Sequence, residues 1–499
     1  MITKKDYYIF VVFFFFYRFL LIYFDLIELK FNNYTELQLI ALNDHFIETL
    51  WFYSTLPVGN FLINKITLYF YTILDLKYLY FILNSLYTFF SIILFSKILI
   101  KINFKKSIIV IFVILISLLM ISYERWQINH HDHINTLIFS LIAYYLFLLI
   151  KNNEENILML SLILLLLVLF STLSIFLLIG IYIFVIFFFQ KPRVLVNSIF
   201  VFFLILNIGI HMKNKINFDL FSATTVSSLN LVQKTIHAIG MHNFINLVMK
   251  DKKINISIKE CHKNIYFENE LYPEGGVNII GQHIYALCFF DFENNRYYYE
   301  KISNISNFKN NKKLKKAIND DEFIFNNKKW ITQFGYAENN LKTAVYFQSI
   351  GPYIFFKAFS KYPYEMLVGQ FGAKGFLLTV SKSLSWGSVF PLDYQAENYN
   401  WTLFEKIISQ LFRIFNMIGL SLSIYYVPKV LKSFFILKKM SKIDIFYLSL
   451  IFISSIFIFL LSLILCCENP RLIVMIFFLI TIISIINYTK MLKKIKFYK

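Results

Sequence analysis

The sequence predicts an all-α, multi-pass integral membrane protein with about ten transmembrane helices and a large extracytoplasmic insert of α or α+β structure. Three observations support this fold class. Of the 499 residues, 58% are hydrophobic, a share well above that of soluble domains. Ten apolar runs are long enough to cross a bilayer, or to pair as shorter tilted spans. One long stretch, 212–403, contains no such run.

The apolar runs divide the chain into three parts. Seven runs form an N-terminal transmembrane module at 1–211, the stretch 212–403 forms an extracytoplasmic loop domain, and three runs lie in the C-terminal part, 404–499. The first run has a basic start but no small-residue cleavage site, so we expect a retained span rather than a signal peptide. The runs lie near 7–24, 79–100, 107–122, 134–150, 156–172, 174–189, 194–211, 404–427, 444–465 and 472–489.

Charges between the runs predict which helix ends face the cytoplasm. The formal net charge of +19 is spread over short segments that flank apolar runs, without a compact basic domain, so we expect no nucleic-acid partner. The positive-inside rule places these segments and both termini in the cytoplasm. We expect the membrane to be a bacterial inner (plasma) membrane. The segments 25–78, 123–133, 212–403 and 466–471 then face the outside. The basic residues are Lys4, Lys5, Lys101, Lys105, Lys106, Lys151, Lys191, Arg193, Lys429, Lys432, Lys438, Lys439, Lys442, Lys490, Lys493, Lys494, Lys496 and Lys499.

The outer segment "YERWQINHHDH", 123–133, gathers six titratable side chains between two apolar runs. Imidazole and carboxylate groups bind metals well, which makes His131, Asp132 and His133 candidate ligands of a divalent metal. Neighbours in sequence point in different directions on a helix, so the three would converge only in a loop. A polar cap on the next helix is the alternative. The six are Glu124, Arg125, His130, His131, Asp132 and His133.

Three arginines are candidates because of their positions relative to the apolar runs. Arg18 and Arg413 are within runs, where a cation usually faces the protein interior or extends to the membrane interface. Arg471 follows "CCENP" at the outer mouth of the last run. There its guanidinium could bind a lipid-linked phosphate through two hydrogen bonds, or it could be an ordinary surface residue at a helix end.

The segment 32–66 alternates acidic and amide residues with apolar ones, and it breaks at Pro57–Gly59. This pattern favours an amphipathic helix in the membrane interface. Its acids, including Glu36 and Asp44, are either solvated groups on a surface anchor or part of a site. The sequence contains no usable Walker loop, GxSxG elbow, HExxH pair or Rossmann fingerprint. Energy-coupled transport and classical hydrolase chemistry therefore have no positive signal. The sequence establishes no cofactor, and a divalent metal remains open.

The order of these parts resembles the GT-C superfamily of polyprenyl-phosphate-sugar-dependent glycosyltransferases, in particular its protein mannosyltransferase and aminoarabinose transferase branch. In that family, a first span with an arginine leads to an acidic outer loop, an amphipathic helix and a proline motif. Here Arg18, Glu36 in "YTEL", the segment through Trp51 and "STLPVGNFLINKI" (54–66) follow in that order.

Two later segments carry the resemblance further. The stretch 123–150 resembles the family's second outer loop and the span after it, with Asp132 at the matching place, and "ENPRLIVMIFFLI" (468–480) resembles the late motif. The likeness covers 7–211 and, more loosely, 404–489. The sequence departs from the pattern where the acidic pair is a single Glu36, the proline pair is one proline, and an aromatic residue is replaced by Leu472.

The resemblance implies transfer of a sugar, usually with inversion, from a polyprenyl-phosphate donor to a lipid, glycan or protein acceptor at the outer membrane face. Such a reaction needs a carboxylate base and cations that neutralise the departing phosphate. The implied base is Glu36, with Asp44 as the alternative, and Asp132 would orient hydroxyl groups. The implied substrate-binding residues are Arg18, Glu124, Arg125, His131, His133, Arg413 and Arg471.

Two other function classes fit the composition. The first is a transporter or flippase for a lipid-linked or anionic substrate, with the outer acids and buried arginines along its pathway. Transporters often have paired halves, whereas this chain has seven spans, an insert and three spans. The second is a scaffold whose polar loops bind partners.

Overall fold

The computed structural model describes the helical part of the chain and a few segments of the long insert. It covers residues 4–24, 26–27, 29, 46–52, 57–71, 73–124, 132–152, 156–171, 174–189, 194–218, 221, 223, 231, 235, 238–240, 243–244, 246–247, 251, 290–291, 296–297, 352–367, 403–437, 441–464 and 474–497.

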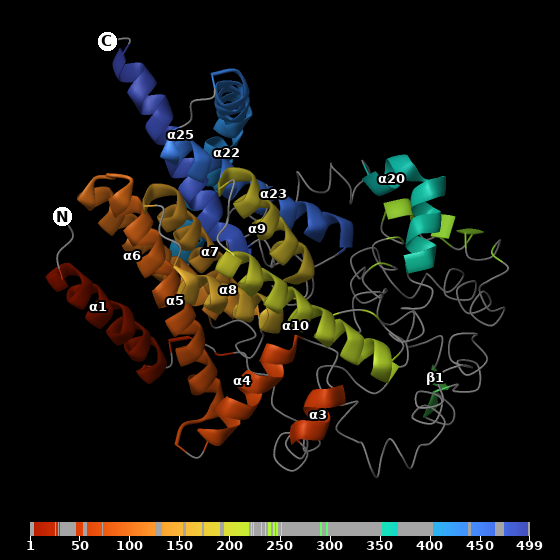
Figure 1. Cartoon of the computed structure of the whole chain (residues 1–499). Coiled ribbons are helices and arrows are strands. Elements are labelled where there is room, and N and C mark those ends of the chain that lie inside the picture. The colour runs from red at the N-terminus through yellow and green to blue at the C-terminus, as the bar shows by residue number, and fades with distance from the viewer. Residues whose placement is uncertain are drawn as a thin grey trace.

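Each of the ten predicted apolar runs coincides with one helix, so the prediction that these runs are helical is confirmed. Figure 1 shows how the helices are arranged. The division between the runs 156–172 and 174–189 is also confirmed, because one helix ends at Phe170 and the next begins at Ser174. The ten helices are α1 (Lys4–Tyr23), α5 (Leu76–Lys101), α6 (Lys106–Glu124), α7 (Asp132–Asn152), α8 (Ile157–Phe170), α9 (Ser174–Phe189), α10 (Val194–Phe218), α22 (Leu403–Leu437), α23 (Lys442–Ile464) and α25 (Phe477–Phe497).

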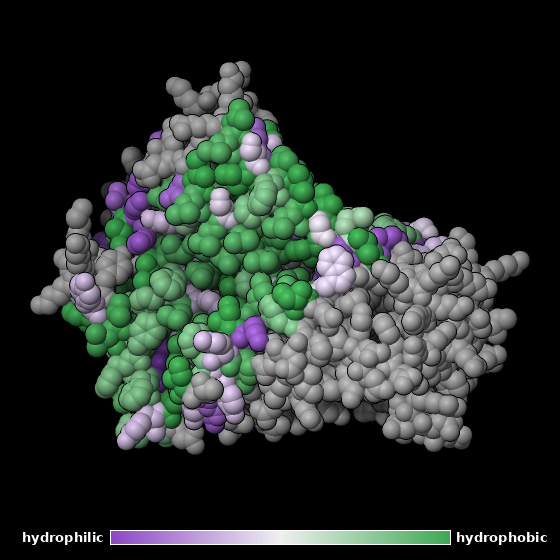
Figure 2. Space-filling view, turned by 60° about the horizontal axis from the view of Figure 1, so that its bottom comes forward, coloured by the Kyte–Doolittle hydropathy of each residue, from purple (hydrophilic) through white to green (hydrophobic). Residues whose placement is uncertain are grey.

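Within the residues that the structure describes, four of these helices contain a stretch that is long and apolar enough to cross a membrane: Leu76–Lys101, His133–Lys151, Val194–Ile216 and Gln410–Ser433. Shorter apolar helices lie beside them. Figure 2 shows a broad hydrophobic surface over the helical part, as expected for helices that face lipid tails. Together, these features indicate a multi-pass membrane protein.

Helix α7 lies at the centre of the bundle. Its apolar stretch is 83% buried, whereas those of α10 and α22 are 28% and 22% buried. It packs against α5, α8, α23, α25 and the short 3-10 helix η5 (Val474–Ile476), which precedes α25. The peripheral helices α10 and α22 expose apolar side chains along much of their length, and α22 packs mainly against α25.

The contact between α22 and α25 is close and partly polar. A Cβ on Gly419 would lie 2.3 Å from the Cβ of Ser484, so only a glycine allows the two helices to approach this near. The amide of Asn487 donates to the Gly419 carbonyl and to the Ser423 hydroxyl, each at 2.8 Å. Close approach and hydrogen bonds stabilise helix pairs in lipid, where burial of apolar surface gives no advantage.

The basic helix ends meet at one end of the bundle. The ammonium of Lys151 donates to the carbonyl of Lys101, and that of Lys442 donates to the carbonyl of Lys151 at 2.7 Å. Lys490 forms an ion pair with Asp444 at 2.6 Å. All these lysines belong to segments that the charge pattern assigns to the cytoplasm, and we call this the inner end.

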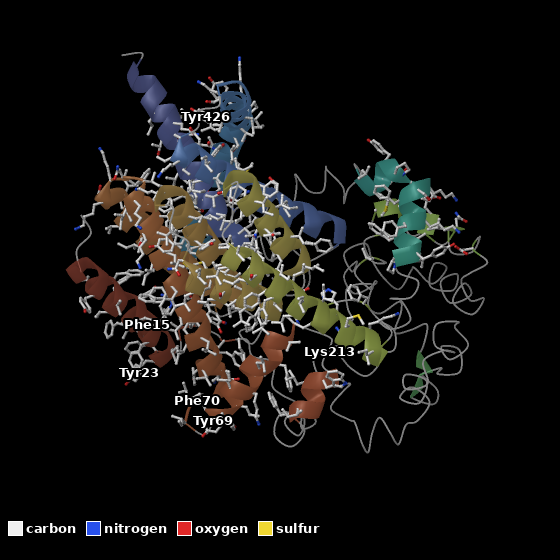
Figure 3. All side chains as sticks on the ribbon, in the orientation of Figure 1. Phe15, Tyr23, Tyr69, Phe70, Lys213 and Tyr426 are labelled. Carbon is white, nitrogen blue, oxygen red and sulfur yellow. The ribbon has the colours of Figure 1, made fainter. Side chains whose placement is uncertain are left out.

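The opposite, outer end holds two short helices, α3 (Phe46–Phe52) and α4 (Val58–Tyr69), which lie at the bottom of Figure 1. Helix α4 begins directly after Pro57, as the predicted break requires. Exposed aromatic side chains, including Tyr23, Tyr69 and Phe70, gather near this end (Figure 3). Aromatic residues concentrate in this way at membrane–water interfaces.

In the long insert, the described elements are small. Helix α10 continues seven residues past the predicted run, to Phe218. Strands β1 (Phe290–Asp291) and β2 (Arg296–Tyr297) form an antiparallel pair, residues 352–361 are helical, and α20 spans Pro363–Leu367. The ammonium of Lys357 binds the buried carboxylate of Asp251, which ties the helical segment to the chain that follows α10.

Candidate functional site

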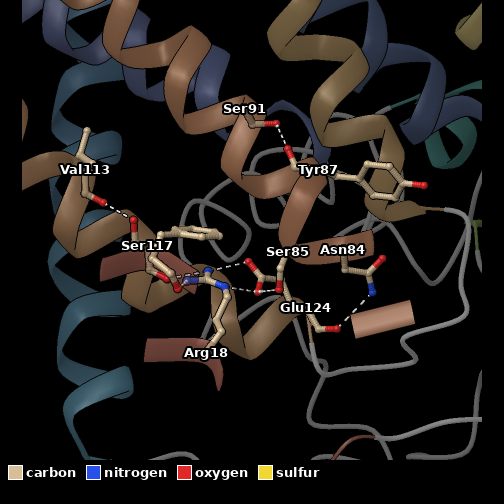
Figure 4. A network of polar contacts seen from close by, with 9 residues as sticks. Arg18, Asn84, Ser85, Tyr87, Ser91, Val113, Ser117 and Glu124 are labelled. Atoms are coloured by element: carbon tan, nitrogen blue, oxygen red, sulfur yellow. Dashed lines mark hydrogen bonds and ion pairs between the residues drawn. The ribbon is translucent and has the colours of Figure 1, made fainter. Parts of the chain in front are cut away.

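A buried ion pair joins α1 to the outer end of α6. Arg18 binds Glu124 through two parallel hydrogen bonds, because Nε donates to Oε2 and one terminal nitrogen donates to Oε1, both at 2.7 Å (Figure 4). The side chain of Arg18 is 3% exposed and that of Glu124 is not exposed at all. This two-point geometry is the strongest form of arginine–carboxylate contact.

Two of the three remaining N–H donors of Arg18 also have partners. The guanidinium donates to the carbonyls of Ser117 at 3.1 Å and Phe14 at 3.3 Å. Its central carbon lies 3.4 Å from the centre of the Phe14 ring. A buried cation is tolerated when its charge is paired and its donors are bonded, and Arg18 has both a paired charge and four hydrogen bonds.

Helix α5 contributes two polar side chains to the same cluster. The hydroxyl of Ser85 donates to Glu124 Oε2 at 2.9 Å, and the amide of Asn84 donates to the Glu124 carbonyl at 3.2 Å (Figure 4). Glu124 is the last residue of α6, so its carbonyl has no partner within that helix. Asn84 therefore caps α6 at the point where the segment 125–131 begins.

A second polar group links α4 to α5. The hydroxyl of Tyr80 donates to Asn64 Oδ1 at 2.5 Å and accepts a hydrogen bond from Thr67 at 3.0 Å. All three side chains are buried. We call the two groups together the outer polar layer, which consists of Arg18, Asn64, Thr67, Tyr80, Asn84, Ser85 and Glu124.

Helix α7 adds buried polar residues near its outer end. His133, Asn135 and Thr136 are each buried within the first five residues of the helix. Helix α7 packs against α5, which carries the buried Thr88 one turn below Asn84. Polar groups buried this far inside an apolar bundle are costly, and they usually mark functional regions.

The structure brings together some of the predicted site residues and leaves others apart. Arg18 and Glu124 form the ion pair, and His133 is buried at the start of α7. Arg413 lies half-buried on α22, and within the described part of the chain it has no hydrogen bond or ion pair. The backbone of Asp132 begins α7, but its side chain lies outside the described residues, as do Glu36, Asp44, Arg125, His131 and Arg471.

Two outer segments leave the bundle near the outer polar layer. The first loop leaves the outer end of α1, five residues beyond Arg18, and returns through α3 and α4. The segment 125–131 leaves from Glu124 and ends at α7.

Comparisons of the chain with protein-family models, curated proteins and solved structures gave no match. The likeness to GT-C glycosyltransferases therefore stays a resemblance in the order of parts.

The metal prediction stays open. Among the side chains that the structure describes, no three His, Cys, Asp or Glu residues lie close enough together to hold a metal ion. Two of the three predicted ligands, His131 and Asp132, have side chains outside that set.

The sequence interpretation missed the polar contribution of α4 and α5. Asn84, Ser85 and Thr88 interrupt the apolar run "LYFILNSLYTFF", at spacings that place them on one face of a helix. That interruption was a usable signal of a buried polar face. The Asn64–Tyr80 contact carries no comparable signal, since both residues are common at membrane interfaces.

Proposed function

We propose that the protein is a membrane glycosyltransferase that transfers a sugar from a polyprenyl-phosphate donor to an acceptor at the outer membrane face. The observation that carries the proposal is the Arg18–Glu124 pair with Ser85 and Asn84. It lies near the points at which the first loop and the 125–131 segment leave the bundle, and it joins α1 to the helix that precedes the 125–131 segment.

This arrangement favours a preorganised site over a flexible surface. Catalytic groups carried on loops need a rigid support, since small displacements of the reacting groups lower the reaction rate. The buried ion pair of Arg18 and Glu124 provides that rigid support. Because its two charges neutralise each other, the pair itself is a positioning element. The acids available for chemistry are then Glu36, Asp44 and Asp132, whose side chains lie outside the described residues.

In the proposed reaction, the acceptor oxygen attacks the anomeric carbon while the bond from that carbon to the phosphate oxygen breaks. Glu36 or Asp44 accepts the acceptor's proton, and polyprenyl phosphate leaves with the bonding electron pair. A phosphate is already a good leaving group, so it requires a cation and no general acid. The candidate cations are Arg125, Arg413 and Arg471. Arg18 is excluded because its guanidinium is already paired with Glu124.

The test is transfer of radiolabelled sugar from a panel of polyprenyl-phosphate sugars to membrane extracts by the full-length protein. Three variants, Glu36→Gln, Asp44→Asn and Asp132→Asn, are compared at equal expression. Loss of a positioned base lowers rates by about 10²- to 10⁴-fold, so one first-loop variant is expected to fall by that factor.

Asp75→Asn is the matched control. Asp75 is an exposed first-loop carboxylate that caps α5 by accepting a hydrogen bond from the Lys77 amide, and its neutralisation leaves the proposed chemistry intact. Undiminished transfer by all three site variants would contradict the site assignment. No transfer by the native protein with any donor would favour the transporter class.

A further inference from the structure

The inner end carries a cationic cluster that the proposed function does not use. Lys97 and Lys101 lie one turn apart on α5, and their ammonium nitrogens are 5.9 Å and 5.7 Å from the centre of the same ring, Tyr144 of α7. Lys97 is exposed and Lys101 is partly exposed. Both lysines therefore sit on the seam between α5 and α7.

These two lysines have no counter-charge in the part of the chain that the structure describes. Lys151 and Lys442 lie beside them, but their ammonium groups donate to the last carbonyls of α5 and α7. Those carbonyls lack partners within their own helices, so the two lysines serve as helix caps. The described acid at this end, Asp444, is already bound by Lys490 and by Ser441.

The depth of the cluster matches a lipid headgroup. Lys101 ends the apolar stretch Leu76–Lys101, and Lys151 ends the stretch His133–Lys151. Lysines at the ends of spanning helices extend along the apolar surface and place their ammonium groups at headgroup level. Side chains four residues apart on a helix are about 6 Å apart, which allows both ammonium groups to contact one phosphate.

The surface below the cluster suits an acyl chain. Phe90 is two turns before Lys97 on α5, hence on the same face, and it is 49% exposed. On the neighbouring α6, Val110, Ile111 and Ile114 are exposed as well. A single lipid could thus place its phosphate at the lysines and its chain along apolar side chains.

We propose that Lys97 and Lys101 form a binding site for the phosphate headgroup of an anionic phospholipid in the inner leaflet. The site is independent of the proposed transferase activity, because it lies at the opposite end of the bundle. Basic pockets between helices on the cytoplasmic side recognise lipids in this way, with a gain of about fivefold in binding for each lysine.

The experiment measures binding of phosphatidylglycerol to the purified full-length protein in zwitterionic nanodiscs, by titration with a fluorescent analogue. The variant Lys97→Gln/Lys101→Gln is compared with Lys429→Gln/Lys432→Gln, which removes the same charge from exposed positions on α22. We expect the first variant to bind at least about tenfold more weakly and the second to bind within about twofold of the native protein.

Two further arms keep the result decisive. The variant Lys97→Arg/Lys101→Arg keeps the charge and is expected to retain binding, and thermal unfolding checks that each variant is folded. Equal losses in both glutamine variants, or no loss in the first, would overturn the site. Full displacement of the lipid by inorganic phosphate at millimolar concentration would show a phosphate site without lipid recognition, which also contradicts the proposal.

Discussion

Arg18 and Glu124 are 106 residues apart in sequence, and they meet inside the bundle with two hydrogen bonds of 2.7 Å. The contact holds α1 against α6 and α5, and both charged groups are shielded from solvent. Removing one partner of such a pair leaves an uncompensated buried charge, whereas replacing both by apolar residues of similar size is often tolerated.

We therefore expect Glu124→Leu and Arg18→Met to lower the free energy of unfolding by about 3–5 kcal/mol each. The double variant should recover most of this loss, and a double-mutant cycle from denaturant unfolding in detergent measures the coupling. Arg18→Lys keeps the charge but loses the two-point geometry, so it should fall between the native protein and Arg18→Met. Additive losses in the double variant would contradict a mutually compensated pair.

Sequence patterns predicted where the chain is helical better than where the helices end. The run 79–100 marks membrane-depth residues, but α5 begins at Leu76 because Asp75 caps it with a side-chain hydrogen bond. Helix α22 passes through Pro428 and continues to Leu437, ten residues beyond its predicted run. Hydropathy reports burial in lipid, whereas a helix can extend past the lipid layer into water.

The sequence predicted only part of the candidate site, because the rest depends on how the helices pack. Arg18 and Glu124 were both identified as unusual in an apolar setting, and each received a substrate-binding role that remains untested. Their mutual contact could not be predicted, because it depends on how α1 and α6 pack. The same holds for Asn64 and Tyr80, whose hydrogen bond depends on the orientation of α4.

Gly419 is expected to be sensitive to substitution. In Gly419→Ala, the new Cβ would lie 2.8 Å from the Ser484 Cα, a backbone atom that cannot move aside without separating α22 from α25. Overpacking of this kind costs about 1–3 kcal/mol. Thermal unfolding in detergent should show a lower midpoint for this variant.

Gly209→Ala on α10 is the matched control. A Cβ at Gly209 meets nothing within 4 Å, and alanine has the higher helix propensity. We expect an unchanged or slightly higher unfolding midpoint. Equal midpoints for the two variants would indicate that α22 and α25 separate at little cost.

The contact of Asp251 with Lys357 and Tyr353 predicts a dependence on alkaline pH. The hydrogen bond to Asp251 raises the pKa of Lys357 above its ordinary 10.5, and the hydrogen bond to Asp251 likewise raises the pKa of Tyr353 above 10.0. A raised pKa in the folded state means that the stabilisation is complete below the unfolded pKa and is lost as the pH rises through the folded pKa. The contact should therefore persist at neutral pH and weaken above about pH 10.

Limited proteolysis of the 352–361 helix at pH 8 and pH 11 measures this effect. We expect faster cleavage at pH 11 in the native protein. The variant Asp251→Asn removes the carboxylate, so its cleavage should be faster at pH 8 and should change less with pH. An identical pH response in both proteins would show that other groups control this segment.

The two ends of the bundle should be accessible from opposite sides of the membrane. Tyr71 is exposed at the outer end, between α4 and α5, and Lys105 is exposed at the inner end, between α5 and α6. In a background in which Cys261, Cys288, Cys466 and Cys467 are serine, Tyr71→Cys should react with a membrane-impermeant maleimide in intact cells. Lys105→Cys should react only after the membrane is opened, because the positive-inside rule places its segment in the cytoplasm. The reverse labelling pattern would invert the topology, and it would place the outer polar layer and the acidic segments on the side where lipid-linked sugars are made rather than used.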